Sequence, residues 1–344
     1  MSRFLQLHFL TFYPPSNLNR DDTGRPKSAV IGGTNRLRIS SQALKRAWRT
    51  SDLFEQKLKD HLASRTQRLG DDVLAHLIRG GMAQPKAIKT ARDIAGVFGK
   101  IKGEDDKNPA RIEQLAFVSP EERAGALALA DRALAGESIE PKAADLLKHM
   151  DHAADLAMFG RMLAGDPDYN REAAVQVAHA FTTHKVSVED DFYTAVDDLK
   201  LASEDAGAGF IGETGFGAGV FYLYACVDRQ LLEANLGDNK SLAADAVAAL
   251  LEAAATVAPG GKQNSFASRA RAHYVLAERG NTQPRTLAAA FTRSVEGDQV
   301  AASVEHLRDW RDALDRAYGD HTESSEMLVG GEGSLAELLT FVRG

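Results

Sequence analysis

The order of strand-like and helix-like segments constrains the fold of this chain more than any other feature of its sequence. Aromatic and aliphatic side chains dominate residues 4–10 (FLQLHFL), 220–227 (VFYLYACV) and 272–278 (AHYVLAE), which predicts three strands. Apolar and polar residues alternate over 175–181, which predicts a fourth strand between the first two of these in the chain order.

Two helices are expected among these strands. Helical spacing of apolar residues predicts one helix over 41–49 and another over 242–257, the second closed by Pro259-Gly260-Gly261. The order strand, helix, strand, strand, helix, strand is the ferredoxin-like βαββαβ order of RNA-recognition domains. We therefore expect an α+β fold of this kind. Further helices are expected over 285–296, 300–317 and 334–342.

A long excursion separates the first helix from the second strand. Residues 52–170 are rich in Ala and in charged residues, with helical spacing in 121–135 and 143–164. This stretch predicts a helical insertion, so that residues 1–51 and 171–344 together form the other domain.

The charge of the chain is distributed unevenly. The 344 residues carry a net charge of −7, yet residues 1–50 hold nine Lys or Arg against two Asp, a net of +7, and the rest holds −14. Because phosphate binding depends on the local potential, this distribution favours a nucleic-acid partner although the whole chain is acidic.

The basic charge is concentrated in RLRISSQALKRAWR, residues 36–49. Ser40 or Ser41 is a suitable N-cap, and Leu44, Ala47 and Trp48 form an apolar stripe. The opposite face then carries Gln42, Lys45, Arg46 and Arg49. Backbone N–H groups at the helix start and cations one turn apart are suited to phosphates, although a solvated face of an ordinary amphipathic helix is the alternative.

A second candidate surface lies in TTHKVSVEDDFYTAVDDLK, residues 182–200. Phe192, Tyr193, Val196 and Leu199 are apolar among polar and acidic neighbours. On a protruding hairpin they would pack on bases, and the alternative is that they pack back onto the body. The Gly-rich run 206–219 predicts a tight turn or a close backbone approach. It is not a phosphate loop, because no Lys-Ser or Lys-Thr follows it.

The remaining chemical signals are weak. Lys262 and Gln263, with Arg269 and Arg271, form a second small basic patch. The spacing of His149, His152 and Asp155 resembles that of metal ligands but is ascribed to chance. We predict no metal site, no cofactor and no catalytic residue. The lone Cys226 and the absence of an apolar run of about 20 residues favour a cytoplasmic protein.

Five motifs, taken together, resemble one known family. They are NLNRDDTGRPKSAVIGGTNRLRISSQALKRAWR (17–49), GRM (160–162), AHAFTTHKVSVEDDFYTAVDDL (178–199), GVFYLYA (219–225) and GKQ (261–263). In this order they are similar to the CasC-type backbone (filament) subunit of Cascade, the type I-E CRISPR surveillance complex.

The resemblance implies a modified RNA-recognition palm, a helical fingers domain over 52–170 and a thumb β-hairpin over about 182–219. It implies that multiple copies form a helical filament along the CRISPR RNA (crRNA), grip its phosphates and kink it periodically for target DNA pairing in antiviral defence. The implied partners are the crRNA, target DNA through the guide, other copies of the chain, and the large, small and 5′- and 3′-end capping subunits of Cascade. It implies no membrane and no catalysis.

The resemblance also implies residue roles. The implied crRNA-binding residues are Arg20, Lys27, Arg38, Ser40, Gln42, Lys45, Arg49, Arg161, Met162, Lys262 and Gln263. Those implied for the thumb and the nucleotide kink are Phe192, Thr194, Val196, Leu199 and Phe216. The chain departs from the family in two places: residues 53–158 hold no matching motif, and Ala218 stands where such sequences often have serine.

Two other functions stay open at this point. One is a metal-dependent target-RNA endonuclease of a related CRISPR effector, with Mg²⁺ held by the adjacent carboxylates Asp21-Asp22, Asp190-Asp191 or Asp197-Asp198. The other is a helical protein-interaction scaffold with no RNA role.

Overall fold

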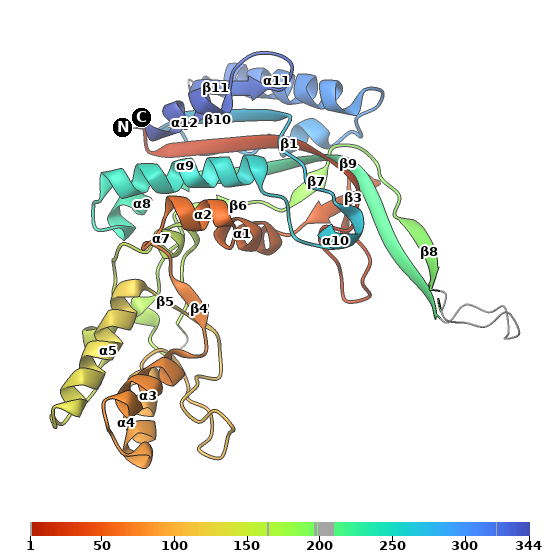
Figure 1. Ribbon diagram of the computed structural model, residues 1–344. Coiled ribbons are helices and arrows are strands. Elements are labelled where there is room, and N and C mark those ends of the chain that lie inside the picture. The colour runs from red at the N-terminus through yellow and green to blue at the C-terminus, as the bar shows by residue number, and fades with distance from the viewer. Residues whose placement is uncertain (1, 164, 196–197, 199–209, 321) are drawn as a thin grey trace, which may run out of the picture.

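A computed structural model describes residues 2–344 of the chain except 164, 196–197, 199–209 and 321. It combines helices with one large antiparallel sheet (Figure 1). The main strand order in this sheet is β11-β10-β1-β9-β7-β3-β2, and β6 and β8 also pair with β9. The strands are β1 (Phe4–Ser16), β2 (Ser28–Ile31), β3 (Thr34–Ile39), β6 (Val175–Val177), β7 (Ala180–Thr182), β8 (Glu189–Ala195), β9 (Phe210–Asp228), β10 (Tyr274–Gly280) and β11 (Glu323–Leu328).

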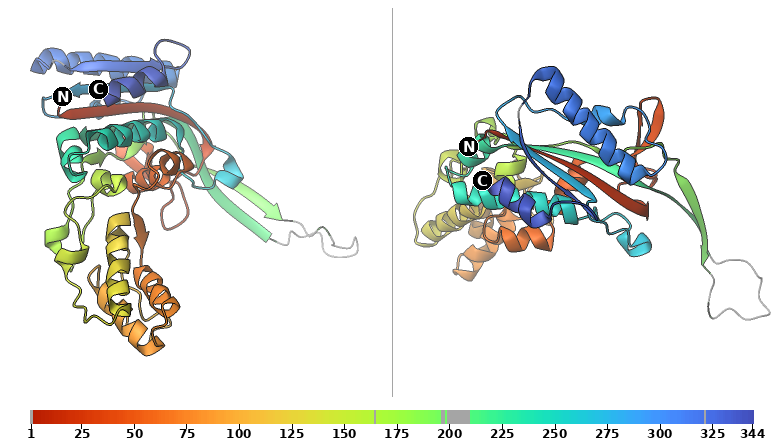
Figure 2. Two further views of the ribbon diagram at one scale, coloured as in Figure 1. Left: turned by 60° about the vertical axis from the view of Figure 1, so that its left-hand side comes forward. Right: turned by 90° about the horizontal axis from the view of Figure 1, so that it is seen from above.

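Helices cover both faces of the sheet, because the side chains of β1 alternate between two apolar cores. Leu5, Leu7 and Phe9 pack with the helices of one face, whereas Leu10 packs on the opposite side. The first face is covered by α1 (Ser41–Arg49), α2 (Asp52–Lys57), α7 (Ala154–Phe159), α8 (Arg229–Asn235), α9 (Lys240–Thr256) and α12 (Leu335–Arg343). The second is covered by α11 (Gln299–Tyr318) and the 3₁₀ turn η2 (Ala288–Phe291), as the views in Figures 1 and 2 show.

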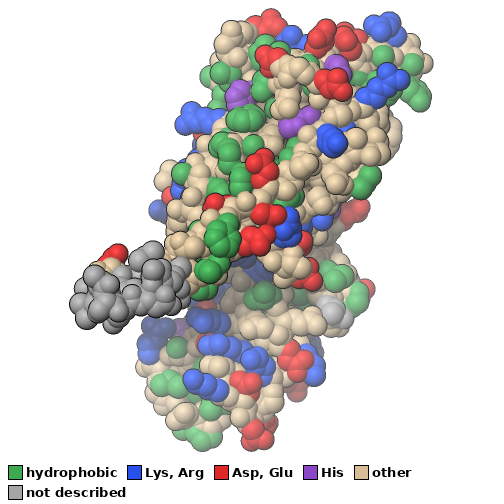
Figure 3. All heavy atoms as spheres, turned by 90° about the vertical axis from the view of Figure 1, so that its right-hand side faces the viewer, with side chains coloured by type: hydrophobic (Ala, Val, Ile, Leu, Met, Phe, Trp, Pro, Cys, Tyr) green, Lys and Arg blue, Asp and Glu red, His purple; other side chains and the backbone are tan. Residues whose placement is uncertain are grey.

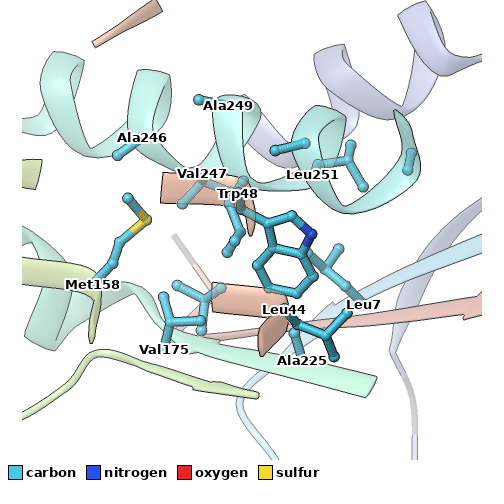
Figure 4. Packing of buried hydrophobic residues seen from close by; sticks show 14 of the residues in the cluster. Leu7, Leu44, Trp48, Met158, Val175, Ala225, Ala246, Val247, Ala249 and Leu251 are labelled. Carbon is cyan, nitrogen blue, oxygen red and sulfur yellow. The ribbon is translucent and has the colours of Figure 1, made fainter. Parts of the chain in front are cut away.

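Trp48 fixes α1 against the first face. Its indole is 1% exposed and lies between α9 and the sheet, close to Val247, Leu7 and Ala225 (Figure 4). Leu44, one turn earlier, is buried in the same core. Burying two large apolar side chains from a nine-residue helix stabilises it by several kcal/mol, roughly 1.5–3 for each. The apolar stripe predicted from the sequence is therefore confirmed, and it sets which side of α1 remains available.

The insertion has a core of its own. It contains β4 (Ser64–Thr66), α3 (Leu69–Arg79), α4 (Gln84–Gly96), β5 (Ala116–Val118), α5 (Pro120–Leu134), α6 (Ala143–Leu146) and the 3₁₀ turn η1 (Pro167–Tyr169). Val73, Ile94 and Leu129 are buried together there, in a cluster separate from the sheet cores. Figure 1 shows α3, α4 and α5 of the insertion below the sheet and the helices that cover it. The helix predicted over 121–135 is confirmed as α5, whereas the helical spacing over 143–164 corresponds only to the short helices α6 and α7, and two short strands were not predicted.

The predicted strands and most predicted helices are present, but the helix expected over 285–296 is wrong. Only η2 forms there, because backbone groups of the segment bond to the sheet and its side chains. The N–H of Leu287 donates to the Tyr222 hydroxyl and that of Val295 to the carbonyl of Thr183. These long-range partners replace the i−4 carbonyls that a helix would use.

The Gly-rich run is also corrected. From residue 210 onward it is the first half of β9 and not a turn. The expected close approach is present, since a Cβ on Gly217 would lie 2.8 Å from Leu37 Cδ1 and one on Gly219 2.8 Å from His184 Nε2. Strands β2, β3 and β11 have no counterpart in the predicted βαββαβ order.

Among the described residues, no helix is long and apolar enough to cross a membrane.

Candidate nucleic-acid interface

Ser40 begins α1 as its N-cap. Its Oγ accepts a hydrogen bond from the N–H of Ala43 at 3.3 Å, and its own N–H donates to Asn19 Oδ1 at 2.8 Å. No acidic residue lies in the first turn, so the positive end of the helix dipole is not neutralised locally. The predicted cap is confirmed, and it joins the helix start to the loop of residues 17–27.

That loop brings two predicted cations to the edge of the sheet. The N–H of Lys27 donates to the carbonyl of Asn19, and the N–H of Arg38 donates to the carbonyl of Lys27. The Arg38 guanidinium lies 2.8 Å from His179 Nδ1. Burial, Arg38 and Lys27 together lower the pKa of His179. The two cations at this edge add a positive local potential, as a phosphate site requires.

The predicted polar face of α1 divides into two stripes. Gln42, Lys45 and Arg49 face α7 and the insertion. The Lys45 ammonium is 5.9 Å from the Phe159 ring centroid, and burial lowers its pKa. Arg46 turns the other way, toward the segment after α9.

Arg49 is only 16% exposed and is held by the insertion. Its guanidinium lies 3.6 Å from Asp155 Oδ2 and 4.9 Å from the Phe117 ring centroid. Burial raises the pKa of Asp155 to about 6, against the opposing effect of two backbone N–H donors and Arg49. Arg49 therefore neutralises a buried carboxylate and offers only one edge of its guanidinium to a ligand.

The metal-like spacing of His149, His152 and Asp155 does not produce a site. Asp155 Oδ1 accepts from the N–H groups of Ala63 and Leu156, while His152 pairs with Glu121 at 2.6 Å and His149 stacks on Tyr169. In the described part of the chain, no group of three or more His, Cys, Asp or Glu side chains is placed to hold a metal ion.

Asp21 and Asp190, one member each of two of the acidic pairs, have structural partners. Asp21 Oδ1 accepts from the N–H groups of Thr23 and Arg25, which closes a tight loop. Asp190 forms an ion pair with Arg25 at 2.9 Å. Asp22 is exposed, and Asp197 lies outside the described residues.

A recess of about 720 Å³ lies between α1 and the segment 257–263. Arg20, Arg46 and Arg269 line it together with Gln263, and Asp52 is the one acidic residue among its lining residues. None of the three arginines lies within ion-pair distance of a carboxylate in the described part of the chain. The structure thus brings the two predicted basic patches together. Figure 3 shows Lys and Arg side chains gathered around the hollow between the body of the sheet and the insertion.

The GKQ motif forms the far wall of this recess. Gly261 packs so tightly that a Cβ there would lie 2.3 Å from the carbonyl oxygen of Leu18. Lys262 then adopts a left-handed conformation with φ of 51°, which is rare for a residue with a side chain. Gln263 donates to the carbonyl of Pro259 and its Oε1 is buried without a partner among the described residues. This strained turn holds Gln263 against the loop of residues 17–27.

Arg46 and Arg269 were absent from the predicted contact set. Arg46 was placed on the basic face of α1, but sequence spacing alone does not say which side of that face meets a second element. Arg269 follows α10 (Gln263–Phe266), and its convergence with α1 depends on a turn 220 residues away in the sequence.

Arg161 and Met162 have opposite environments. The Arg161 side chain is 1% exposed and lies 2.6 Å from Glu122, so its guanidinium is engaged inside the protein, and the crRNA contact implied for Arg161 stays a prediction. Met162 is 83% exposed. A single exposed apolar side chain is common on protein surfaces, so the exposure of Met162 makes it available for a contact but does not by itself indicate one.

The hairpin of β8 and the first half of β9, here called the β8–β9 arm, extends from the sheet (Figure 2). Phe192 on this arm is 66% exposed, and Tyr193, Phe210 and Ile211 are also exposed. These side chains therefore do not pack back onto the body. Thr194 is exposed beside them, whereas Phe216 packs near Phe266 at the base of the arm, with ring centroids 6.1 Å apart. Val196 and Leu199 lie outside the described residues.

Comparison with known proteins agrees with this architecture. The model of the CT1975-like protein family (Cas_CT1975) matches residues 5–339. No curated protein matches the chain. A solved chain described as "CRISPR RNA-guided surveillance complex, pre-nicking" is similar with a TM-score of 0.87 and 31% identity, over 98% of this chain and 99% of that one. A second, described as "CRISPR RNA-guided surveillance complex", is similar with a TM-score of 0.73 and 28% identity, over 97% and 94%. The chain belongs to the CT1975-like family of Cas proteins.

Proposed function

We propose that this protein is a guide-RNA-binding backbone subunit of a CRISPR surveillance complex, of the CasC type found in type I-E Cascade. The similarity to chains of RNA-guided surveillance complexes over nearly the whole length supports the class of assembly. The observation that carries the RNA-binding role is the recess beside α1, where Arg20, Arg46 and Arg269 converge without carboxylate partners among the described residues.

The chemistry of this surface suits a guide of any sequence. Guanidinium and ammonium groups bind phosphate oxygens, which are the same in every nucleotide. The positive end of α1, which has no acidic residue in its first turn, and the Lys27–Arg38 edge extend the surface along a strand. A subunit that leaves base edges free allows the guide to pair with target DNA.

The sheet order supports an RNA-recognition palm of modified form. Strands β10, β1, β9 and β7 are adjacent in that order and antiparallel, as in ferredoxin-like βαββαβ domains. In ordinary RNA-recognition domains bases stack on the open sheet face. Here Tyr222 and Leu276 of that sheet are buried under Phe291 and α11, so the proposal assigns RNA binding to α1, its flanking loops and the arm.

The same proposal assigns the domains. Residues 1–51 and 171–344 form the palm, 52–170 the fingers, and about 182–219 the thumb. The exposed Phe192 and Thr194 on the β8–β9 arm, and Met162, are the side chains that kink the guide at intervals along a helical filament. The partners are the crRNA, target DNA through the guide, further copies of the chain, and the large, small and end-capping subunits, in the cytoplasm.

Co-expression of the protein with its guide RNA tests this proposal. We expect the two to copurify, and electron microscopy to show copies spaced regularly along the RNA. Protein that purifies without RNA and binds none in a salt-dependent manner would instead indicate a protein-interaction scaffold.

The proposal includes no catalysis, and the nuclease alternative has its own test. Purified complex is incubated with complementary RNA and Mg²⁺. Cleavage at regular intervals that is lost in Asp22→Ala would overturn the non-catalytic role. Asp22 is the better variant, because Asp21 closes its own loop and its loss would also disturb the fold there.

A further inference from the structure

Met162 is presented at a turn whose neighbours are buried. It is 83% exposed, whereas Arg161 and Leu163 on either side are each 5% exposed. The chain reaches it directly from α7, which ends at Phe159 beside Lys45. The position of Met162 relative to the basic helix therefore depends on what holds residues 160–171, here called the 160–171 ribbon.

The ribbon is closed at its base by a backbone bridge. The N–H of Arg161 donates to the carbonyl of Arg171 at 3.0 Å, and the N–H of Arg171 donates back at 2.8 Å. Gly160, with φ of +76°, begins the ribbon, and a Cβ there would lie 2.8 Å from the carbonyl oxygen of Arg171. The two ends of the ribbon can approach this closely only because residue 160 is glycine.

Each arginine of the bridge then enters a buried ion pair. Arg161 lies 2.6 Å from Glu122 Oε2, with the two side chains 1% and 0% exposed. Arg171 lies 2.7 Å from Asp151 Oδ1, with the side chains 2% and 0% exposed. Both ion pairs are therefore removed from solvent.

The backbone of one residue, Lys148, joins the two pairs. The carbonyl of Lys148 accepts from both guanidiniums, at 3.4 Å from Arg161 and 2.9 Å from Arg171, while its N–H donates to Glu122 Oε1. Glu122 also completes the capping box of α5 by accepting from the N–H of Ser119. The start of α5, the segment 148–151 and the ribbon thus form one hydrogen-bonded unit.

We propose that Glu122 and Asp151 are positioning residues for Met162: through Arg161 and Arg171 they fix the ribbon to the insertion so that Met162 is held at a set place beside α1. The inference rests on the proposed function, in which Met162 meets the guide. Each guanidinium contacts its carboxylate through Nη1 and donates through Nη2 to the carbonyl of Lys148. Two directional hydrogen bonds per guanidinium specify its orientation, whereas apolar packing of equal area would hold the ribbon without fixing its angle.

A distance measurement on RNA-free protein tests the positioning role. Nitroxide labels are attached through Met162→Cys and Gln42→Cys. Cys226 is buried and does not compete for the label. We expect one narrow distance distribution in the otherwise unchanged protein. Asp151→Asn and Glu122→Gln, which keep side-chain shape, should each replace it with a broad one.

Glu137→Gln is the matched control, since Glu137 pairs with Arg132 at 2.7 Å on the surface of the same insertion. It should leave the distribution narrow. Folded Asp151→Asn and Glu122→Gln proteins that keep the narrow distribution would overturn the proposal.

A double variant keeps the proposal testable if the single variants do not fold. Removing one partner of a buried pair can unfold a domain, whereas apolar replacement of both partners is often tolerated. If the single variants unfold the insertion, Arg161→Met combined with Glu122→Leu restores a folded protein with a broad distribution. A narrow distribution, or failure of this double variant to fold, assigns the pair to stability alone and overturns the positioning role.

Chemical probing of the guide separates this inference from the proposed function. Met162→Ala should remove the periodic reactivity of guide nucleotides, and Met150→Ala, which changes an exposed methionine of the same insertion, should not. If Met162→Ala leaves the pattern unchanged, the guide contact fails while the label distances still decide the positioning role. If Met162→Ala removes the pattern, Asp151→Asn should remove it as well, and an intact pattern there would overturn the inference.

Discussion

At the scale of single residues, neighbouring cations of one helix have different surroundings. Lys45 and Arg49 are one turn apart on α1, and spacing predicts equal roles for them. Lys45 has an aromatic ring nearby and no ion pair with a described residue. Arg49 neutralises buried Asp155. The distinction depends on a carboxylate 106 positions away in the sequence, so no local pattern contains it.

Lys45→Ala and Arg49→Ala should therefore behave differently. Lys45→Ala should reduce the log–log salt slope of RNA binding by roughly 0.7, the value for one phosphate contact of a single strand, with little change in thermal stability. Arg49→Ala leaves Asp155 unpaired and should also lower the free energy of unfolding, by about 1–3 kcal/mol, less than for a fully buried pair. Arg49→Lys is the control that keeps the charge. Equal thermal stability of the two alanine variants would contradict this account of Arg49.

The difference in the free energy of unfolding between Asp155→Asn and the natural protein should depend on pH. Burial raises the pKa of Asp155 from 3.8 to about 6, so the folded state binds the proton more tightly than the unfolded state. The natural protein therefore loses stability from this carboxyl as pH rises from about 4 to 6, by at most roughly 3 kcal/mol. Asp155→Asn has no such loss. Urea unfolding should show that Asp155→Asn becomes more stable relative to the natural protein as pH rises from about 4 to 6. A difference in stability that stays constant over this range would contradict a raised pKa for Asp155.

Some residue roles could be predicted from the sequence and others could not. Ser40 as N-cap and Leu44 and Trp48 as core anchors follow from patterns within nine residues. The burial of Arg161 depends on Glu122, which is 39 positions earlier, so the GRM motif itself does not indicate it. Short sequence patterns therefore indicated where the candidate interface lies, whereas contacts with distant residues determine which of its cations form ion pairs.

At the scale of elements, the recess depends on how three segments meet. α1, the loop of residues 17–27 and the turn at 261–263 form its walls. Helix α1 follows from helical periodicity and the second half of β9 from a continuous apolar run, but the failed helix at 285–296 and the unpredicted β11 show the limit of such patterns. Partners on distant strands determined both: the Tyr222 hydroxyl accepts from the N–H of Leu287, and β11 pairs with β10.

Gly261→Ala should disturb the recess more than Gly260→Ala. An added Cβ at position 261 meets the backbone of Leu18 and Asn17, which cannot move aside without shifting the loop. At position 260 it meets nothing within 4 Å. We expect Gly261→Ala to lower stability by about 1–3 kcal/mol, as for other overpacked sites, and to weaken RNA binding. Equal melting temperatures and RNA affinities for the two variants would argue against the close contact.

Arg46→Ala and Arg269→Ala should each weaken RNA binding to a similar extent for unrelated sequences. Each removes one cation from the recess, so each should lower the magnitude of the salt slope by roughly 0.7. Arg316→Ala, an exposed arginine of α11 on the other face of the sheet, is the control and should have little effect. An effect of Arg316→Ala as large as the others would show that overall charge and not the recess is responsible.

At the scale of the whole molecule, the charge is uneven along the chain. The basic N-terminal 50 residues contribute α1 and its loops to one recess, whereas the other residues carry a net charge of −14. Under the proposed function, we expect this negative charge to disfavour contacts of nucleic acid with the rest of the protein. The sequence indicated the uneven charge directly, although it did not indicate that helices cover both faces of the sheet.

The most direct test of the central claim is the equilibrium affinity of the protein for two unrelated single-stranded RNAs over a series of salt concentrations. The account predicts equal affinities and equal log–log slopes for both RNAs, with the slope reduced by roughly 1.4 in the double variant Lys45→Ala, Arg46→Ala. Affinity that is independent of salt, or that differs between the two RNAs and is unchanged in the double variant, would contradict a sequence-tolerant phosphate grip at α1.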